Sequence, residues 1–343
     1  MSVNKLRVLA LVHQHLIPPD QVDEGADITS EPWRTEYDVI STLRGAGHEV
    51  QPLGVHDDLR EIRRLATEWK PHIAFNLLEA FDDVTIFDQN VISYLELLKL
   101  SYTGCNPRGL LLSRDKSLSK KLLAYHRIPV PEFEVFRIGR PIRRPKRLEF
   151  PLIVKSLTQE ASIGISQASV VDSDDKLKER VTFIHESIGT TAIAEQYIDG
   201  RELYVGILGN QALQALPVWE LFFTNMPEGS KRIATDRVKW SVRYQKKYGI
   251  DSGPARDLPD ATCEAIQHFC KRAYRALELS GYARIDLRMD EAGHVWVLEA
   301  NPNPQIAKGE DFADSAAKIG IGYDAVLQRI LNLGLRWQPE SVA

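Results

Sequence analysis

Residues 283–301 read ARIDLRMDEAGHVWVLEAN. Two apolar runs with strand-like composition, Ala283–Met289 and Val295–Glu299, flank the polar segment 290–293, which contains the turn formers Asp and Gly. The pattern predicts a β-hairpin, and the rest of the chain is interpreted outward from it.

The register of this hairpin determines which side chains share a face, because side chains alternate between the two faces of a strand. A loop of two or four residues pairs the strands so that one face carries polar groups, whereas an unbulged three-residue loop would not. The polar face then holds Arg284, Asp286, Glu299 and Asn301. The opposite face is predicted to be core: Ile285, Leu287, Met289, Leu298 and Ala300.

Two interpretations of the polar face remain open from the hairpin alone. Carboxylate and amide oxygens are hard ligands of the kind that Mg²⁺ takes, together with substrate phosphates. The alternative is a cross-strand salt bridge between Arg284 and Glu299, with Asp286 solvated.

Composition indicates an ordinary globular protein. The chain has 343 residues, enough for two or three domains, with 43% hydrophobic and 26% charged residues. A net charge of −4 does not indicate a basic surface that would bind nucleic acid. We expect no signal peptide and no membrane partner, because no apolar run reaches membrane-spanning length.

Cysteine usage indicates the compartment. Cys105, Cys263 and Cys270 are an odd set without CxxC spacing. They are expected to be reduced, structural cysteines of a cytoplasmic protein.

The first hundred residues alternate between strand and helix patterns. Strands are predicted at Leu6–Val12, His48–Leu53 and His72–Leu77, with helices at about 29–46 and 57–69. This alternation predicts βαβ units around a parallel sheet.

Polar residues follow the predicted strands, and ligands of parallel sheets bind at the carboxyl ends of strands. His13, Asn76 and Glu79 are therefore candidates for part of a substrate site. His13 and His15 form an HxH pair that can bind metal. No third ligand lies nearby in the sequence, so an ordinary loop at the strand end is the favoured interpretation.

The middle of the chain suggests a phosphate-covering flap. Phe150–Lys155 is a predicted strand that ends in a lysine, and a short loop leads into a second predicted strand at Ile163–Val170. The loop is not a P-loop, because GxxxxGK[ST] is absent. The basic segment Arg140–Arg147 before it is interpreted as an exposed linker, with a patch for an anionic partner as the alternative.

Four further segments complete the pattern. Thr191–Ile198 is a predicted strand whose edge can offer backbone groups to a purine. The polar segment 222–260 is predicted to be an active-site lid. Amphipathic helices are predicted at Asp260–Glu278 and Ser315–Leu333.

In this order, the segments resemble the ATP-grasp superfamily, and specifically D-alanine–D-alanine ligases, over about residues 72–335. The resemblance rests on the ordered set of motifs YTG at Tyr102–Gly104, DK at Asp115-Lys116, IVK at Ile153–Lys155, ASIGIS at Ala161–Ser166, EQYIDGRE at Glu195–Glu202, KKY at Lys246–Tyr248, ARID at Ala283–Asp286 and LEANPNP at Leu298–Pro304.

The resemblance implies an α/β protein with the ATP-grasp fold, an α+β lid and an N-terminal Rossmann-like pre-ATP-grasp domain. The implied domains are residues 1–113, the central lid 114–197 and the C-terminal domain 198–343, which holds the metal site. The resemblance also allows a homodimer formed through the N-terminal domain.

The resemblance also implies roles for individual residues. Binding of ATP is implied for Lys116, Lys155, Ser162, Glu195, Gln196, Tyr197, Ile198 and Glu202, the last on the ribose. Asp286, Glu299 and Asn301 resemble the ligands of two Mg²⁺ ions, for which Mn²⁺ could substitute. Lys247 resembles a lysine that reaches the γ-phosphate, and Arg284 an arginine that steadies the transferred phosphate.

The implied reaction joins a small-molecule carboxylate to an amine. The carboxylate attacks the γ-phosphorus to give an acyl phosphate and ADP, and the amine then expels phosphate. Such chemistry needs positioning and charge neutralisation rather than a protein nucleophile.

Departures from the family pattern concern the substrate pockets. The glycine-rich turn and glutamate that hold the first D-alanine are replaced by ALVHQHLIPPD, and Ala161 replaces a flap serine. Pro302-Asn303-Pro304-Gln305 replaces a small Ser-Pro-Gly segment, and Glu310, followed by Asp311, replaces a serine that helps to hold the second substrate's carboxylate. Tyr248, Asn303 and Glu310 therefore join the substrate candidates.

Three functions follow. The first is an ATP-dependent ligase of this family that acts on a pair other than two D-alanines. The alternatives are D-alanine–D-alanine ligase itself and a non-catalytic, regulatory nucleotide-binding protein.

Overall fold

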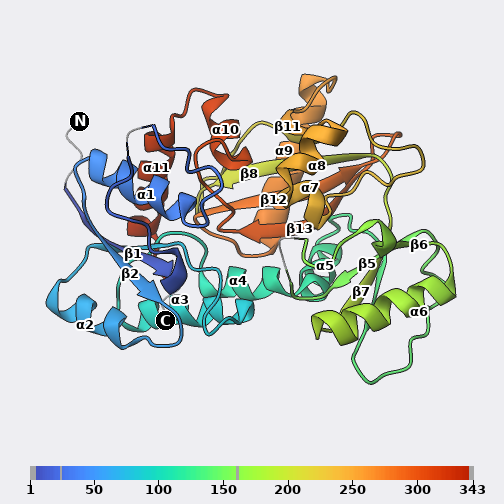
Figure 1. The fold of residues 1–343 in the computed structure, drawn as a ribbon, viewed down its shortest axis with the longest axis horizontal. Helices are drawn as coiled ribbons and strands as arrows, with labels where there is room; N and C mark the ends of the chain where they lie inside the picture. Colours follow the sequence, from blue (N-terminus) through green and yellow to red (C-terminus); the bar gives the residue numbers. More distant parts are fainter. Residues whose placement is uncertain (1–4, 24, 160–161, 340–343) are drawn as a thin grey trace.

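The computed structural model describes residues 5–23, 25–159 and 162–339, which form three sheets (Figure 1). The N-terminal sheet has the strand order β2-β1-β3, from β1 (Arg7–His13), β2 (Glu49–Val55) and β3 (Ile73–Asn76). Both pairings are parallel, so the prediction of a parallel βαβ sheet is confirmed. Its helices are α1 (Arg34–Gly45), α2 (Arg60–Glu68) and α3 (Asp88–Leu97).

A pair of helices leads from this sheet to the next. These are α4 (Pro107–Arg114) and α5 (Lys116–Tyr125). Asp115 separates them and caps α5, its Oδ1 accepting from the backbone N–H of Ser117 at 2.8 Å and of Leu118 at 2.9 Å. A capping carboxylate satisfies N–H groups that the first turn leaves unpaired, which fixes where α5 begins.

The lid sheet is antiparallel, with the order β4-β7-β5-β6. Its strands are β4 (Phe133–Phe136), β5 (Leu152–Ser156), β6 (Val170–Val171) and β7 (Ala192–Gln196), and α6 (Asp174–Phe183) packs on it. The predicted strand Ile163–Val170 is wrong, because only its last residue is in β6. Ser162 and Gly164 have φ of +63° and +73°, a left-handed backbone that no strand can contain.

The third sheet is the largest, and all of its pairings are antiparallel. Its strands are β11 (Ile250–Pro254), β10 (Trp219–Phe223), β8 (Arg201–Leu208), β12 (Tyr282–Met289) and β13 (Val295–Pro302) in that order, with β9 (Gln214–Ala215) beside β8. The prediction of one long lid over 222–260 is partly wrong. Its ends pair as β10 and β11, and the intervening segment carries α7 (Asp236–Trp240) and α8 (Val242–Tyr248).

Three helices complete the C-terminal part: α9 (Asp260–Ala276), α10 (Asp311–Ala317) and α11 (Tyr323–Arg336). The predicted single helix Ser315–Leu333 is therefore wrong. Gly320, with φ of +78°, lies between α10 and α11 and gives the chain a left-handed turn there. None of the helices in the described part of the chain is long and apolar enough to cross a membrane.

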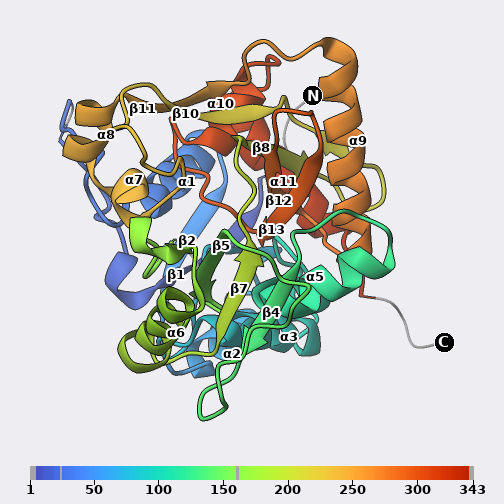
Figure 2. The same ribbon diagram turned by 90° about the vertical axis from the view of Figure 1, so that its right-hand side faces the viewer.

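The lid and the remainder of the protein have separate hydrophobic cores. Apolar side chains of the N-terminal sheet, such as Leu9 and Leu11, belong to the same buried cluster as Val205 and Ile285 of the large sheet. The lid has a cluster of its own around Val154 and the residues of α6. Figure 2 shows the lid strands β5 and β7 below β12 and β13. Two separately packed units thus face each other, and the predicted boundaries at residues 113 and 197 remain a prediction.

The cysteines and one carboxylate are notable within these cores. Cys105 and Cys270 are buried, and all three cysteines are free, as predicted. Glu36 of α1 is 5% exposed, and its Oε2 has no hydrogen-bond partner among the described residues. Burial raises the pKa of Glu36 to about 7; a backbone hydrogen bond opposes this and the charge of Glu79 adds to it.

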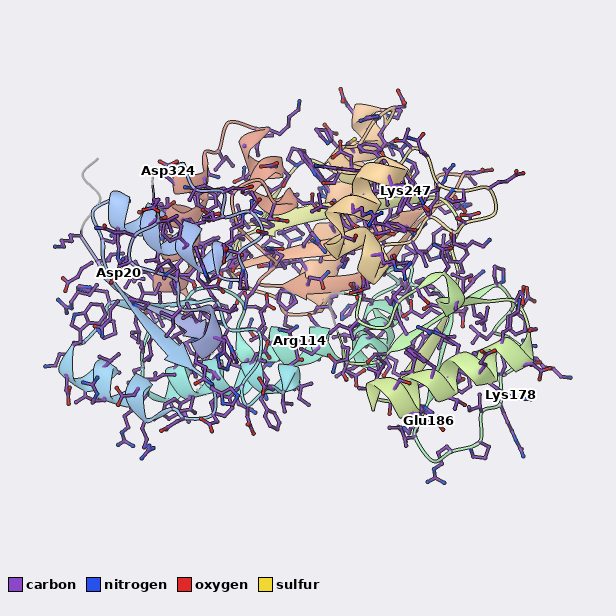
Figure 3. All side chains as sticks on the ribbon, viewed as in Figure 1. Asp20, Arg114, Lys178, Glu186, Lys247 and Asp324 are labelled. Carbon is purple, nitrogen blue, oxygen red and sulfur yellow. The ribbon has the colours of Figure 1, made fainter. Side chains whose placement is uncertain are left out.

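This buried carboxyl predicts a pH-dependent stability. A carboxyl group whose pKa is higher in the folded state destabilises the fold once it ionises. Glu36→Gln should match the wild type in its free energy of unfolding near pH 4, and should exceed it by up to about 3 kcal/mol near pH 8. Urea unfolding at both pH values, with the exposed Glu186→Gln (Figure 3) as control, checks this. The same Glu36→Gln difference at both pH values would contradict it.

Candidate active site

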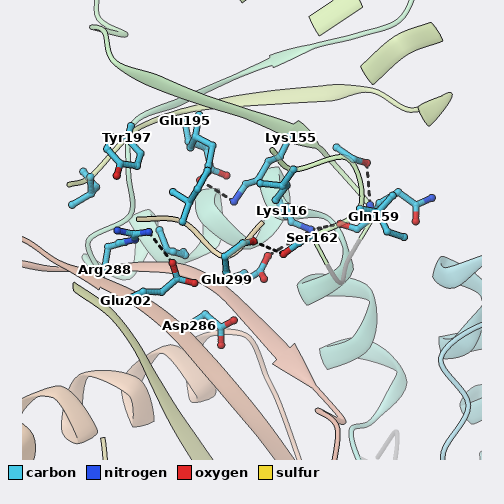
Figure 4. A pocket seen from close by; sticks show the side chains of 18 of the residues that line it. Lys116, Lys155, Gln159, Ser162, Glu195, Tyr197, Glu202, Asp286, Arg288 and Glu299 are labelled. Carbon is cyan, nitrogen blue, oxygen red and sulfur yellow. Dashed lines mark hydrogen bonds and ion pairs between the residues drawn. The ribbon is translucent and has the colours of Figure 1, made fainter. Parts of the chain in front are cut away.

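A cavity lies between the lid sheet and the large sheet (Figure 4). Lys155 of β5 and Glu195 of β7 enter it from the lid, and Asp286 of β12 and Glu299 of β13 enter it from the opposite side. Lys116, the first residue of α5, contributes a second lysine. Cationic and anionic groups therefore meet across one enclosed space.

The cavity brings together the residues that the resemblance assigns to the nucleotide. All eight line it: Lys116, Lys155, Ser162, Glu195, Gln196, Tyr197, Ile198 and Glu202. Two of the three predicted metal ligands, Asp286 and Glu299, line it as well. Ala161 lies outside the described residues.

Both lysines are buried and already have polar partners. Lys116 Nζ donates to the backbone oxygen of Gln159 at 2.8 Å and lies 3.7 Å from Glu299 Oε2. Lys155 Nζ lies 3.1 Å from Glu195 Oε2. These contacts hold the two ammonium groups at the cavity wall, where phosphate oxygens could exchange for the present partners.

The hairpin places its polar face as expected. Its register differs from both predicted ones only near the turn, because from Asp286 to Ala283 the pairing is the one that a two-residue loop predicts. Met289 pairs with Val295, so neither predicted loop forms. The register shifts between Asp286 and Leu287, and beyond this β-bulge Asp286 pairs with Glu299. Without the bulge, the turn would have placed the two carboxylates on opposite faces.

The bulge also corrects the predicted core. Leu298, the extra residue of β13, lines the cavity rather than the core, and Val297 is fully buried in the core instead. The other predicted core residues of the hairpin, Ile285, Leu287, Met289 and Ala300, are buried.

Lys120 holds this bulge, and the sequence interpretation missed it. Its side chain is fully buried, and Nζ donates to the backbone oxygen of Leu298 at 2.7 Å. Nζ also lies 3.4 Å from Glu195 Oε2. Burial lowers the pKa of Lys120 to about 8, although Glu195 opposes the shift. One feature of the sequence could have pointed to Lys120. It lies four residues after Lys116, and this spacing puts both lysines on one face of a helix.

The residues predicted to bind metal have a defined arrangement in this structure. Arg284 donates to both oxygens of Asp286, at 2.7 and 2.9 Å, so the alternative pairing of Arg284 with Glu299 is wrong. Asp286 is buried rather than solvated. Asn301 pairs with Arg284 across the strands, and its buried Nδ2 lacks a hydrogen-bond partner in the described part of the chain. An amide that no internal contact fixes, beside two carboxylates, fits the oxygen donor set of a hard divalent cation.

The carboxylates differ electrostatically. Burial by itself raises the pKa of Glu299, but Lys116, Lys155, Lys239 and Arg284 together bring it below the ordinary value. Glu299 is therefore an anion at neutral pH even without a metal.

Glu202 is held by neighbours that the sequence interpretation did not include. Its Oε2 accepts from Arg288 Nη2 at 2.7 Å, and its Oε1 accepts from the Tyr204 hydroxyl at 2.9 Å. Arg288 also donates to the backbone oxygens of Gly200 and Arg232. These bonds connect the floor of the cavity to the segment that carries α7.

Lys247 does not line the cavity. It is exposed on α8, with Nζ 4.8 Å from the ring centroid of Tyr248, and Figure 3 shows it among the helices above the sheet. Tyr248 in turn contacts Tyr244, with ring centroids 4.5 Å apart. Lys239 of α7, which the motif comparison passed over, lines the cavity instead.

Two of the substrate candidates bind the protein itself. Asn76 is buried, and its Oδ1 accepts from the backbone N–H of Leu78 at 3.2 Å. Asn303 Oδ1 accepts from the backbone N–H of Cys105 at 2.8 Å and so ties the end of β13 to the start of α4. Both side chains therefore hold loops in place, and no substrate contact is needed to explain them.

The remaining substrate candidates do not line the cavity. Glu310 is paired with Arg34 of α1 at 3.2 Å. Glu79 is exposed beyond β3. His13 ends β1 beside His56, with ring centroids 5.6 Å apart.

Two antiparallel sheets that clamp a cavity, with Lys155 reaching in from the lid and Asp286 and Glu299 from the opposite sheet, are typical of ATP-grasp proteins. Comparison with protein families matches residues 122–332 to the family described as D-ala D-ala ligase C-terminus. The D-alanine–D-alanine ligase of Bordetella petrii is 36% identical over 236 residues, which cover 67% of this chain and 66% of that protein. The corresponding ligase of Desulforudis audaxviator is 29% identical, covering 86% of this chain and 90% of that protein.

Two further relatives cover most of the chain. The protein y4sG of Sinorhizobium fredii, described as uncharacterized, is 29% identical and covers 89% of this chain and 90% of its own length. The crystal structure of D-alanine–D-alanine ligase from Bacillus anthracis complexed with ATP superposes with a TM-score of 0.73 at 21% identity, over 96% of this chain and 98% of that one. The chain belongs to the D-alanine–D-alanine ligase family and is an ATP-dependent ligase that forms carbon–nitrogen bonds.

The position of Lys120 predicts a large stability effect. Lys120→Met should lower the free energy of unfolding by about 3 kcal/mol, because it removes a partner of a buried carboxylate and of a backbone oxygen. Lys121→Met, at the exposed neighbouring position, should change it by less than about 0.5 kcal/mol. Urea unfolding of the two variants at pH 7 makes the comparison, and equal losses would show that Lys120 has no special role.

Proposed function

We propose that the protein uses ATP and Mg²⁺ to join a small-molecule carboxylate to an amine through an acyl phosphate. One observation carries the proposal. Lys116 and Lys155 face Asp286 and Glu299 across a single cavity. Asn301 lies two residues beyond Glu299 on β13, and its buried Nδ2 has no hydrogen-bond partner among the described residues. That arrangement supplies cations for phosphate oxygens and oxygen ligands for a metal at the same place.

The nucleotide would lie along the lid. Lys116 and Lys155 would hold its phosphates, and the end of β7 from Glu195 to Ile198 would contact adenine, with Glu202 on the ribose. Lys239, which already lines the cavity, is our candidate for the cation that follows the γ-phosphate, with Lys247 from the neighbouring helix as the alternative. Asp286, Glu299 and Asn301 would hold two Mg²⁺ ions, which neutralise phosphate charge when bound.

The residues then account for both half-reactions. A carboxylate oxygen of the first substrate forms a bond to the γ-phosphorus while the β–γ bridge breaks and ADP leaves. The amine forms a bond to the acyl carbon, the acyl–phosphate bond breaks, and the amine loses a proton. Arg284, once released from Asp286, would steady the transferred phosphate and the charge that develops on the acyl oxygen.

We infer that the substrate pair differs from two D-alanines. The family's amine-binding glutamate is missing after β1, and Glu310 stands where a carboxylate-binding serine is expected. Burial raises the pKa of Glu310, and Arg34 opposes this. Arg34 offsets part of this acidic charge, but the carboxyl groups of Glu310 and Asp311 still disfavour a free amino-acid carboxylate, so a bulkier or cationic amine fits better.

D-alanine–D-alanine ligase activity itself is the second candidate, because the relatives from Bordetella petrii and Desulforudis audaxviator carry that name. The cytoplasm as its location and a homodimer as its assembly remain predictions.

ADP release on a panel of carboxylates and amines, with D-alanine included, tests the activity and separates the two candidates. A dipeptide formed from D-alanine alone would support the second candidate. An amide product that needs another acid or amine, identified by mass spectrometry, would support the first.

The proposed metal ligands can be tested against a control substitution in the same hairpin. Asp286→Asn and Glu299→Gln should each lower kcat by about 100-fold or more, because each removes charge that holds the metal against the transferred phosphate. Asp290→Asn, at the turn of the same hairpin, should retain kcat within about twofold. Full ADP release by Glu299→Gln would contradict the role of Glu299 in holding the metal, whereas a biological role that Glu299→Gln leaves untouched would favour a non-catalytic nucleotide-binding protein.

A further inference from the structure

The loops after β1 and β2 bring together three histidines to which the proposed ligase reaction assigns no role. His13 is the last residue of β1, and His56 directly follows β2. His15 lies in the short helix η1 (Gln14–Leu16), with its ring centroid 5.3 Å from that of His13 and 6.4 Å from that of His56. The HxH pair of the sequence thus gains the further ligands that it lacked along the chain.

Asp83 completes the group. Its Oδ1 lies 3.7 Å from His13 Nε2, and its Oδ2 lies 3.3 Å from His56 Nε2. One ligand atom from each of the three residues can be chosen so that all lie within 4.8 Å of one another. Ligands of a single tetrahedral Zn²⁺ at 2.0–2.2 Å are about 3.3–3.6 Å apart, which is close to these separations.

The backbone holds these side chains in place. His13 pairs with Val55 in the parallel sheet, so the ends of β1 and β2 are adjacent. The backbone N–H of Asp82 donates to the backbone oxygen of His56 at 2.8 Å. Gly54 lets η1 approach β2 closely, since a Cβ there would lie 3.1 Å from the backbone Cα of Gln14. Binding of a ligand would therefore cost little conformational entropy in these loops.

The surroundings favour a cation. Asp57 Oδ1 lies 3.7 Å from His56 Nδ1, longer than a hydrogen bond, so its negative charge is near the ring nitrogen that a carboxylate usually supports in a metal-bound histidine. His13 Nδ1 accepts a long hydrogen bond of 3.4 Å from the backbone N–H of His15. Binding through Nε2 would need the other tautomer of His13 and would give up this bond, which contributes little at that length.

We propose that His13, His56 and Asp83 form a second metal site, selective for Zn²⁺ and similar imidazole-binding transition metals. Imidazole nitrogens favour Zn²⁺ over Mg²⁺, whereas the oxygen donors of Asp286, Glu299 and Asn301 favour the reverse. His15 or water completes the coordination, and the position at the carboxyl ends of parallel strands leaves the metal accessible to a ligand.

Zn²⁺ binding to the full-length, chelator-treated protein tests the proposal. Calorimetry with Zn²⁺ in excess Mg²⁺ should give one site. His56→Ala and Asp83→Asn should each weaken it by about 100-fold or more, since even an outer partner of a metal ligand is worth 10- to 100-fold. His294→Ala removes an exposed histidine that is paired with Asp290 at 3.1 Å, and it should leave the affinity unchanged.

Two further measurements distinguish this site from the active site and report the geometry of the bound metal. Asp286→Asn should leave Zn²⁺ binding intact, and Co²⁺ should give a visible absorption typical of tetrahedral coordination that His56→Ala abolishes. Unchanged Zn²⁺ affinity in both His56→Ala and Asp83→Asn would overturn the proposal, as would loss of Zn²⁺ binding in Asp286→Asn. Circular dichroism of the metal-free variants checks that they fold.

Discussion

The hydrogen bond from Lys120 to the backbone oxygen of Leu298 is the contact on which the active site depends. It lies at the β-bulge that moves Glu299 onto the face of Asp286. A lysine is rarely fully buried, because desolvation disfavours its charge. Here the backbone oxygen and Glu195 offset part of this cost, and the same side chain connects α5, the lid strand β7 and the hairpin of β12 and β13.

The charged groups of the cavity form a connected network rather than isolated ion pairs. Glu195 lies close to both Lys120 and Lys155, and Lys116 lies between the lid loop and Glu299. Arg284 similarly occupies Asp286. Lys116, Lys155, Asp286 and Glu299 therefore each already have a partner of opposite charge, which stabilises the charged groups of the cavity and lets ligands enter by exchange.

The sequence predicted the parallel N-terminal sheet, the polar hairpin face and the lining of the cavity because these depend on local patterns and on motifs with fixed spacing. It missed Lys120, Lys239 and Arg288, whose partners are distant along the chain. It also gave the hairpin a regular register, although a bulge decides it, and extended a strand through Ser162, where the backbone is left-handed. Asn303 was taken for a substrate ligand because pattern alone does not show that its amide is bound to Cys105.

The central claim is that the cavity holds a magnesium nucleotide between the lid lysines and the hairpin carboxylates. A crystal structure with Mg²⁺ and a non-hydrolysable ATP analogue tests it most directly. We expect the phosphates on Lys116 and Lys155, and the metal on Asp286, Glu299 and Asn301 with Arg284 released from Asp286. A nucleotide bound elsewhere, or Arg284 and Asp286 still paired with no metal beside them, would contradict the account.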